Sequence, residues 1–167
     1  AGGIGDPQVR NRGTIGGSIA NNDPSACYPS ACMALNAIIH TSERKIEASK
    51  FFKGMFETAL KKGELIEAVE FQIPEKSSYQ KYPNPASRYA IVGVYVAKHK
   101  TGVNVAVTGA KSCVYNDENI SKALEGSFSS NSISNIELDS SEMNSDIHAS
   151  AEFRSSLVIT QAKKAVD

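Results

Sequence analysis

The chain has 167 residues and a mass of 17.9 kDa, which is enough for one medium domain or two small ones. Apolar residues make up 41% and charged residues 22%, which is ordinary globular usage and excludes wholesale disorder, a collagen repeat and a coiled coil. Eighteen basic and eighteen acidic residues leave a formal charge of zero. Such a chain lacks the long-range field that attracts nucleic acid or an anionic membrane, so we expect neither as a partner.

Glycine is concentrated at the start of the chain, where residues 1–24 contain six. Glycine loses the most entropy on ordering and offers no side chain to pack, so we expect no regular helix or packed strand there. The segment opens without a cap, a strand or a start methionine, and we therefore expect the chain to enter a domain partway through.

The following segment predicts short elements. A helix is expected over 29–35, because proline is tolerated in a first turn. Residues 36–40 and 44–47 read as two strands around a Thr-Ser turn. Ser49 then resembles an N-cap for a short helix over 50–54, with Gly54 at its end.

From residue 64 onward the pattern changes to strands. Four are predicted, over residues 65–73, 77–82, 89–99 and 103–115. The last two are rich in valine and are joined by Lys100-Thr-Gly102, a hairpin signal that predicts an antiparallel sheet.

The rest of the chain predicts helices and one connection. A short helix is expected over 119–124, and the seven serines of residues 127–141 indicate a solvated connection. Residues 146–166 form the longest helical pattern, with Ile147, Phe153 and Leu157 able to share one face. The fold class predicted is therefore α+β.

No pattern in the chain indicates a membrane span or a metal site. The longest apolar run, 89–97, is less than half the length of a membrane-spanning helix, and no basic-then-apolar leader opens the sequence. Cys27, Cys32 and Cys113 are odd in number and form no C-x-x-C pair, which fits neither a disulfide framework nor a zinc or iron–sulfur site. We expect a cytoplasmic location.

The segment Arg10-Asn-Arg-Gly-Thr-Ile-Gly-Gly-Ser18 has the composition of a loop that holds an anion. Paired glycines let the backbone approach a ligand closely, Thr14 and Ser18 add hydroxyl donors, and the arginines add positive charge. Alone, such a glycine pair is more often a tight turn. Neither a Walker A loop nor a G-x-G-x-x-G dinucleotide fingerprint is present.

The longer segment from Gly5 to Pro24 resembles the second flavin-contacting loop of the FAD-binding (medium) subunits of molybdenum hydroxylases, as in aerobic carbon monoxide dehydrogenase and xanthine dehydrogenase. The similarity continues through Phe51–Thr58, Glu64-Leu-Ile66 and Tyr79-Gln-Lys81. It closes with Asp146–Arg154, which resembles the family's C-terminal helix. The resemblance spans nearly the whole chain, with its motifs in order.

The resemblance implies a fold and a set of cofactor-binding residues. Residues 1–58 would be the C-terminal part of the second lobe of a two-lobed FAD-binding domain. Residues 59–167 would be a small antiparallel sheet packed with helices, the family's C-terminal domain. The residues implied to contact the flavin are Thr14, Ile15, Gly16, Gly17, Ser18, Asn22, Asp23, Ile66 and Lys81. Lys81 would place a cation beside the isoalloxazine ring; without the resemblance it reads as an exposed strand lysine.

Two departures from the family pattern affect this reading. Cys27 stands where the family commonly has an acidic residue, and a thiol does not replace an ionised carboxylate as an acceptor. The family's earlier lobe, whose A-G-G loop cradles the pyrophosphate, has no counterpart in this sequence. The flavin site implied here is therefore partial.

By resemblance, the chain is the flavin-binding subunit of a complex with an iron–sulfur small subunit and a molybdopterin large subunit. Electrons would pass through the flavin to an external acceptor, and no catalytic residue or metal ligand is assigned to this chain. A stand-alone flavin oxidase and a cofactor-free docking module remain as alternatives. His40, His99 and His148 are scattered and suggest no catalytic site.

Overall fold

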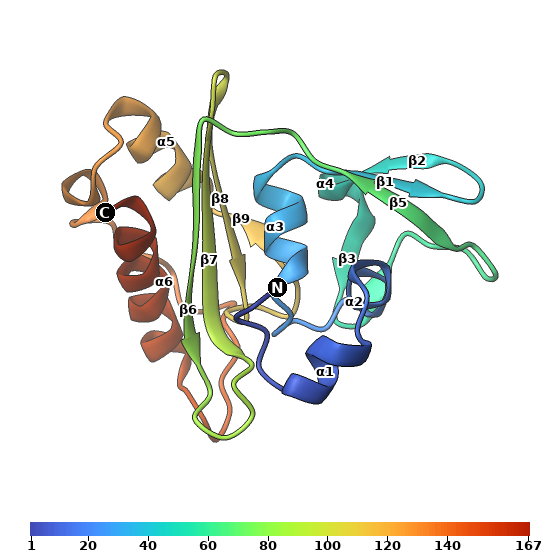
Figure 1. Ribbon diagram of the computed structural model, residues 1–167. Helices are drawn as coiled ribbons and strands as arrows, with labels where there is room; N and C mark the ends of the chain where they lie inside the picture. The colour runs from blue at the N-terminus through green and yellow to red at the C-terminus, as the bar shows by residue number, and fades with distance from the viewer.

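The computed structural model describes residues 1–167 as helices packed on three antiparallel sheets (Figure 1). The helices are α1 (Pro7–Arg12), α2 (Ile15–Asn21), α3 (Tyr28–Ala34), α4 (Ala48–Phe51), α5 (Glu118–Gly126), the 3₁₀ helix η1 (Ser130–Ile133) and α6 (Ala151–Val166). The strands are β1 (Ile38–Thr41), β2 (Lys45–Glu47), β3 (Phe52–Gly54), β4 (Glu57–Thr58), β5 (Ile66–Glu70), β6 (Lys76–Pro83), β7 (Ala90–His99), β8 (Gly102–Thr108) and β9 (Tyr115–Asn116). This mixture confirms the predicted α+β class.

The larger sheet has the order β6-β7-β8-β9 and is buried on both faces of its central strands. Helices α5 and α6 cover one face, and α3 lies against the other (Figure 1). The main core forms between the sheet and α5 and α6, and its most buried members are Val92, Val94, Val105, Val107, Ile120, Leu124 and Val158. On the α3 side the contacts are made by small residues, Ala34 of the helix and Ala97 and Ala106 of the sheet.

The smaller sheet has the order β2-β1-β5 and covers a second core that includes Ile19, Ile39 and Phe51. β5 pairs antiparallel with β1, so residues 66–70 belong to this smaller sheet. The division of the chain at residue 58 remains a prediction. The pairing of β5 with β1 adds a strand from beyond this division to the sheet of the N-terminal part.

The expectation that the glycine-rich start is irregular is wrong. Residues 7–12 and 15–21 are helices, and each begins at a capping side chain. Asp6 Oδ1 accepts the N–H of Gln8 at 2.6 Å, and Thr14 Oγ1 accepts the N–H of Gly17 at 2.9 Å. Helix α2 also buries Ile19 completely. Capping and burial of this one side chain outweigh the entropy cost of the two glycines.

Three other local predictions differ from the structure. The helix predicted over 50–54 begins two residues earlier, at Ala48, and ends at Phe51. It has no side-chain cap, and β3 follows it directly. The strand predicted over 103–115 ends at Thr108, and the next residue, Gly109, has φ +82°. The serine-rich stretch contains η1, whose Ile133 is fully buried.

The C-terminal helix begins at residue 151 because Ser150 Oγ accepts the N–H of Phe153 at 3.2 Å. Ile147 therefore lies outside the helix and is 95% exposed, contrary to the predicted apolar face. Asp146 instead accepts the N–H groups of His148 and Ala149.

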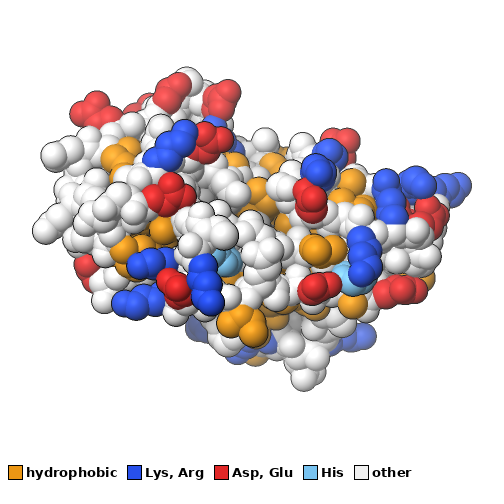
Figure 2. All heavy atoms as spheres, turned by 90° about the horizontal axis from the view of Figure 1, so that it is seen from above, with side chains coloured by type: hydrophobic (Ala, Val, Ile, Leu, Met, Phe, Trp, Pro, Cys, Tyr) orange, Lys and Arg blue, Asp and Glu red, His pale blue; other side chains and the backbone are white.

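The surface carries charges of both signs. Figure 2 shows acidic and basic side chains interspersed over one face of the molecule, as expected for a chain of zero formal charge. No helix in the structure combines the length and apolar character that crossing a membrane requires.

Arg154 joins helix α6 to the large sheet from a buried position. Its guanidinium donates to the carbonyls of Ile91 at 2.6 Å and Gly109 at 3.0 Å, and it pairs with Asp146 at 2.6 Å. The side chain of Arg154 is only 5% exposed, so water does not reach these carbonyls to replace the guanidinium as their donor.

Replacing Arg154 by Met should lower the free energy of unfolding by about 2–4 kcal/mol, since two buried carbonyls lose their donor. Urea denaturation of both proteins measures the difference. Lys164→Met, at an exposed position of the same helix, is the matched control and should change stability by no more than about 0.5 kcal/mol. Equal losses in the two variants would show that the buried guanidinium does not hold the helix.

Candidate functional site

A cavity of about 600 Å³ lies where the N-terminal helices, the loop before α3 and strand β6 meet. Its apolar wall includes Ile4, Val9, Tyr28 and Tyr89. The volume lies within the range of pockets that hold small molecules and cofactors. Because its wall comes from segments far apart in the sequence, the cavity exists only when the N-terminal segment and the loop before α3 are packed against the large sheet.

Five of the nine predicted flavin-contacting residues line this cavity: Thr14, Gly17, Ser18, Asp23 and Lys81. The sequence motif and the distant lysine are thus brought together by the fold. Whether they contact a cofactor stays a prediction.

The other four, Ile15, Gly16, Asn22 and Ile66, are not part of the lining. Ile15 and Ile66 pack against the smaller core, and a Cβ added at Gly16 would meet Ile66 at 3.8 Å. Asn22 ends helix α2 in the left-handed region, with φ 45°. Its Nδ2 donates to the carbonyls of Gly54 and Glu57 at 2.7 and 2.8 Å, so Asn22 holds the β3–β4 hairpin.

The two adjacent glycines of the motif lie in a helix with ordinary backbone angles. Neither needs glycine for a positive φ, so their value lies in the missing side chain. At Gly17 a Cβ would stand 3.1 Å from Thr14 Oγ1, on the side that faces the cavity. Glycine at this position therefore keeps the wall of the cavity open.

Positive charge dominates the cavity. Arg10, Arg12 and Lys81 line it, against the single carboxylate of Asp23. Arg10 is held in place by the carbonyls of Ile4 and Gly5. A cavity with this excess of cations suits a ligand that carries negative charge.

Lys81 projects from β6 and is fixed by backbone oxygens. Its Nζ donates to the carbonyls of Gly3 and Arg88, the latter at 3.1 Å, and lies 3.7 Å from the sulfur of Cys27. Cys27 also lines the cavity. The ammonium is thus positioned at the junction of the N-terminal segment, the loop before α3 and the large sheet.

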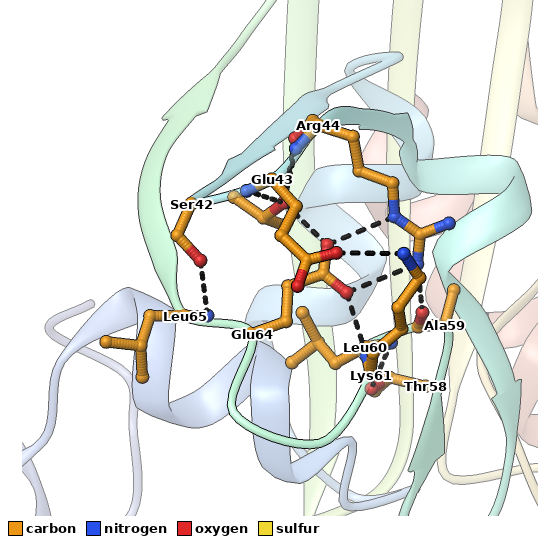
Figure 3. Close-up of polar contacts among 10 residues, drawn as sticks. Ser42, Glu43, Arg44, Thr58, Ala59, Leu60, Lys61, Glu64 and Leu65 are labelled. Atoms are coloured by element: carbon orange, nitrogen blue, oxygen red, sulfur yellow. Dashed lines mark hydrogen bonds and ion pairs between the residues drawn. The ribbon is translucent and has the colours of Figure 1, made fainter.

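The buried carboxylate of Glu64 forms a network of polar contacts outside the lining of the cavity (Figure 3). Glu64 accepts hydrogen bonds from Thr41 Oγ1 at 2.6 Å, from Arg44 Nε at 3.1 Å and from the Lys61 N–H at 2.8 Å. Its side chain is fully buried. Hydrogen bonds from Arg44 and then Thr41 lower the pKa of Glu64 to about 2.

This network fixes the start of strand β5. Ser42 Oγ accepts the Leu65 N–H at 3.2 Å (Figure 3), so the turn over 61–65 is held on the β1–β2 hairpin. Ile66 follows directly and packs beside Gly16 of helix α2. The Glu64 network therefore positions the segment on which α2 rests.

Several residues of the site have roles that the sequence patterns did not indicate. Tyr28 and Tyr89 line the cavity, and Glu64 and Arg44 form the buried pair, but only the fold brings them together. The arginines could be anticipated, because they lie within the glycine-pair motif.

Comparison with known proteins identifies relatives along the whole chain. Residues 1–75 match the family described as the FAD binding domain in molybdopterin dehydrogenase. The glyceraldehyde dehydrogenase medium chain of Sulfolobus acidocaldarius is 44% identical over 100 residues, which are 56% of this chain and 36% of the relative. The nicotine 6-hydroxylase medium subunit of Paenarthrobacter nicotinovorans is 32% identical over 93% of this chain and 60% of its own length.

The fold is also similar to a solved structure. A chain of CO dehydrogenase from Oligotropha carboxidovorans superposes with a TM-score of 0.84 at 26% identity, covering 98% of this chain and 63% of that one. This chain thus spans between about a third and two thirds of the length of these relatives.

The stability contributed by Glu64 should depend on pH in a defined direction. Its pKa falls from an ordinary 4.5 to about 2 on folding, so its contribution is complete above pH 4.5 and is lost as the pH falls through 2. Glu64→Gln should therefore destabilise the chain at pH 7, and the difference from the unsubstituted chain should shrink as the pH is lowered. Denaturant unfolding across this pH range measures it.

Glu67→Gln, at an exposed position of β5, is the matched control and should alter stability little at any pH. A Glu64→Gln effect that stays constant from pH 7 down to pH 2 would contradict the role of the ionised carboxylate.

Proposed function

We propose that the chain is the C-terminal portion of the FAD-binding medium subunit of a molybdenum hydroxylase. The match of residues 1–75 to the family described as the FAD binding domain in molybdopterin dehydrogenase supports this assignment. The matched solved chain and the nicotine 6-hydroxylase subunit extend the similarity over nearly all residues. The chain is thus part of an oxidoreductase subunit.

The observation that carries the proposal is the cavity beside Thr14–Ser18. FAD has a flat aromatic ring system and an anionic diphosphate. The cavity offers apolar surface from Tyr28 and Tyr89, and cationic side chains from Arg10 and Arg12. The residues present therefore fit the cofactor of the family.

Several side chains have roles that follow from their positions. Thr14 and Ser18 face the cavity and would offer hydroxyl donors, and Gly17 leaves room for the ligand. Lys81 would place its ammonium where negative charge develops on a reduced flavin ring. Asp23 would stay beside the same wall, where its Oδ1 accepts the Ser25 N–H at 2.8 Å.

Ile15, Gly16, Asn22 and Ile66 remain proposed as flavin-contacting residues on the strength of the family motif alone. In this chain they pack behind the lining, and contact with the cofactor would be through the backbone or through the elements they support.

When bound, FAD supplies reversible transfer of one or two electrons. We propose that the intact subunit receives electrons from an iron–sulfur small subunit, that a molybdopterin large subunit oxidises the substrate, and that an external molecule is the final acceptor. The chain would contribute no catalytic residue and no metal ligand. The expected cytoplasmic location rests on the cysteine count and stays a prediction.

Purification of the full gene product from its natural source tests the proposal. Visible flavin absorbance, with iron and molybdenum in co-purifying subunits, is the expected result. Flavin without these metals or subunits would favour a stand-alone flavin oxidase, and absence of flavin would favour a docking module without cofactor.

Gly17→Val in the intact subunit should lower bound flavin at least about tenfold, because the new side chain projects into the cavity. Stability should change little, since valine adds no positive-φ strain in helix α2. Flavin absorbance per protein and a thermal melt measure the two effects. Gly126→Val, at the end of α5, where an added Cβ meets nothing within 4 Å and which does not line the cavity, is the matched control and should retain flavin. Full flavin content in Gly17→Val would mean that the motif is only a structural turn.

The 167-residue chain by itself should bind FAD weakly, with a dissociation constant above about 1 µM. The family's pyrophosphate loop is not in this sequence, and each missing charge-assisted hydrogen bond weakens binding by about 1.5–3 kcal/mol. Titration calorimetry with FAD is the direct measurement. Binding at or below about 1 µM would show that residues 1–167 hold the complete site.

A further inference from the structure

Cys27, which has no role in the proposed flavin chemistry, meets Lys81 in the wall of the cavity. The Lys81 Nζ lies 3.7 Å from the Cys27 sulfur. The two residues are 54 positions apart and come from the loop before α3 and from strand β6. Both line the cavity, so a small solute reaches them from solvent.

The three cysteines have different surroundings, and only one is paired with a cation. Cys32 is fully buried, and desolvation raises its pKa to about 12. The sulfur of Cys113 has the neutral amide of Asn22 at 3.5 Å. Cys27 has the Lys81 ammonium 3.7 Å from its sulfur, so it is the cysteine of the three that has an amine nitrogen within reach.

Tyr79 is a second group that lies near the Cys27 sulfur. The Tyr79 hydroxyl is buried and has no hydrogen-bond partner. It lies against Gly93, where an added Cβ would stand 2.3 Å away. Burial and then the nearby Cys27 raise the pKa of Tyr79, so its hydroxyl stays protonated. An oxygen atom added to the Cys27 sulfur would give this unpartnered hydroxyl an acceptor.

From this geometry we propose that Cys27 and Lys81 form a reversible, oxidation-driven covalent cross-link between the loop before α3 and strand β6. Hydrogen peroxide oxidises the Cys27 thiol to a sulfenic acid, and one water leaves. The Lys81 ammonium then gives one proton to solvent, and its nitrogen attacks the sulfur. The S–N bond forms as the S–O bond breaks, and the hydroxyl leaves as a second water. Sulfur loses two electrons and peroxide gains them.

The reach of Lys81 permits this step. Closing from 3.7 Å to bonding distance needs a movement of about 2 Å, which the flexible four-carbon stem of lysine provides. The cross-link would remove one of the three cations of the cavity and fix the loop before α3 to β6. Thiol reductants would restore both side chains. The chemistry requires no flavin, so it stands or falls independently of the proposed function.

The test is peroxide treatment of the 167-residue chain, followed by intact-mass measurement and tryptic peptide mapping. The cross-link lowers the mass by about 2 Da relative to the reduced chain, whereas a sulfenic acid alone raises it by about 16 Da. Trypsin cannot cleave at a linked Lys81, so segments 13–44 and 77–88 should appear as one joined species that dithiothreitol separates.

Matched variants assign the link. Cys27→Ser and Lys81→Arg should each abolish it, and Lys81→Arg keeps the positive charge beside the sulfur. Cys113→Ser should leave it unchanged. Circular dichroism and thermal melts confirm that each variant is folded.

Three results would overturn the proposal. One is a Cys27 that is oxidised by peroxide but never joined to Lys81. Another is a joined species that persists in Cys27→Ser. The third is a joined species that persists in Lys81→Arg.

Discussion

The hydrogen bonds between the end of strand β8 and the loop before α3 determine where the cavity forms. Thr108 Oγ1 lies 2.6 Å from the carbonyl oxygen of Pro24 and 2.8 Å from that of Ala26, and the Gly109 N–H donates to Pro24 at 2.7 Å. Thr108 is buried, so water does not compete for these carbonyls. Without this connection Asp23 and Cys27 would not face Lys81, and the cavity would lose one wall.

Helix α3 also holds the loop before it against the large sheet. Its last carbonyl, that of Ala34, accepts hydrogen bonds from His99 Nε2 and Asn104 Nδ2, both at 2.9 Å. The helix approaches the sheet closely because alanines face it there. The two sheets are thus joined through the short segment 23–36, which carries both the loop of the cavity and the helix that docks it.

Sequence patterns predicted the elements whose periodicity depends on local burial, such as the valine-rich hairpin of β7 and β8. They failed where contacts between residues far apart in the sequence determine the local structure. Residues 15–21 read as irregular because glycine disfavours helix, yet the Thr14 cap and the burial of Ile19 stabilise one. The break at Gly109 was missed because the contacts of this residue are distant in sequence: its N–H donates to the Pro24 carbonyl, and its own carbonyl accepts from Arg154, 45 positions away.

The candidate site shows the same limit. The motif predicted Thr14, Gly17 and Ser18 in the wall, since a family motif records which residues face a ligand. Nothing local indicated that Asn22 would hold the β3–β4 hairpin, or that the Glu64 carboxylate would be buried against Arg44. Such roles depend on pairing between strands, and they become visible only in three dimensions.

The architecture assigns different parts of the site to different units. Helix α2 and the N-terminal segment supply hydroxyls, glycine and arginines, whereas the large sheet supplies Lys81 and, beside β7, Tyr89. The second unit is therefore more than a neighbour of a nucleotide-binding lobe, because it contributes the only cation of the lining that is not in helix α1. A change that loosens the docking of the two units would alter the charge of the cavity without touching the glycine motif. This dependence explains why the contacts of Thr108, Ala34 and Glu64, which do not reach the cavity, nevertheless set its shape and its charge.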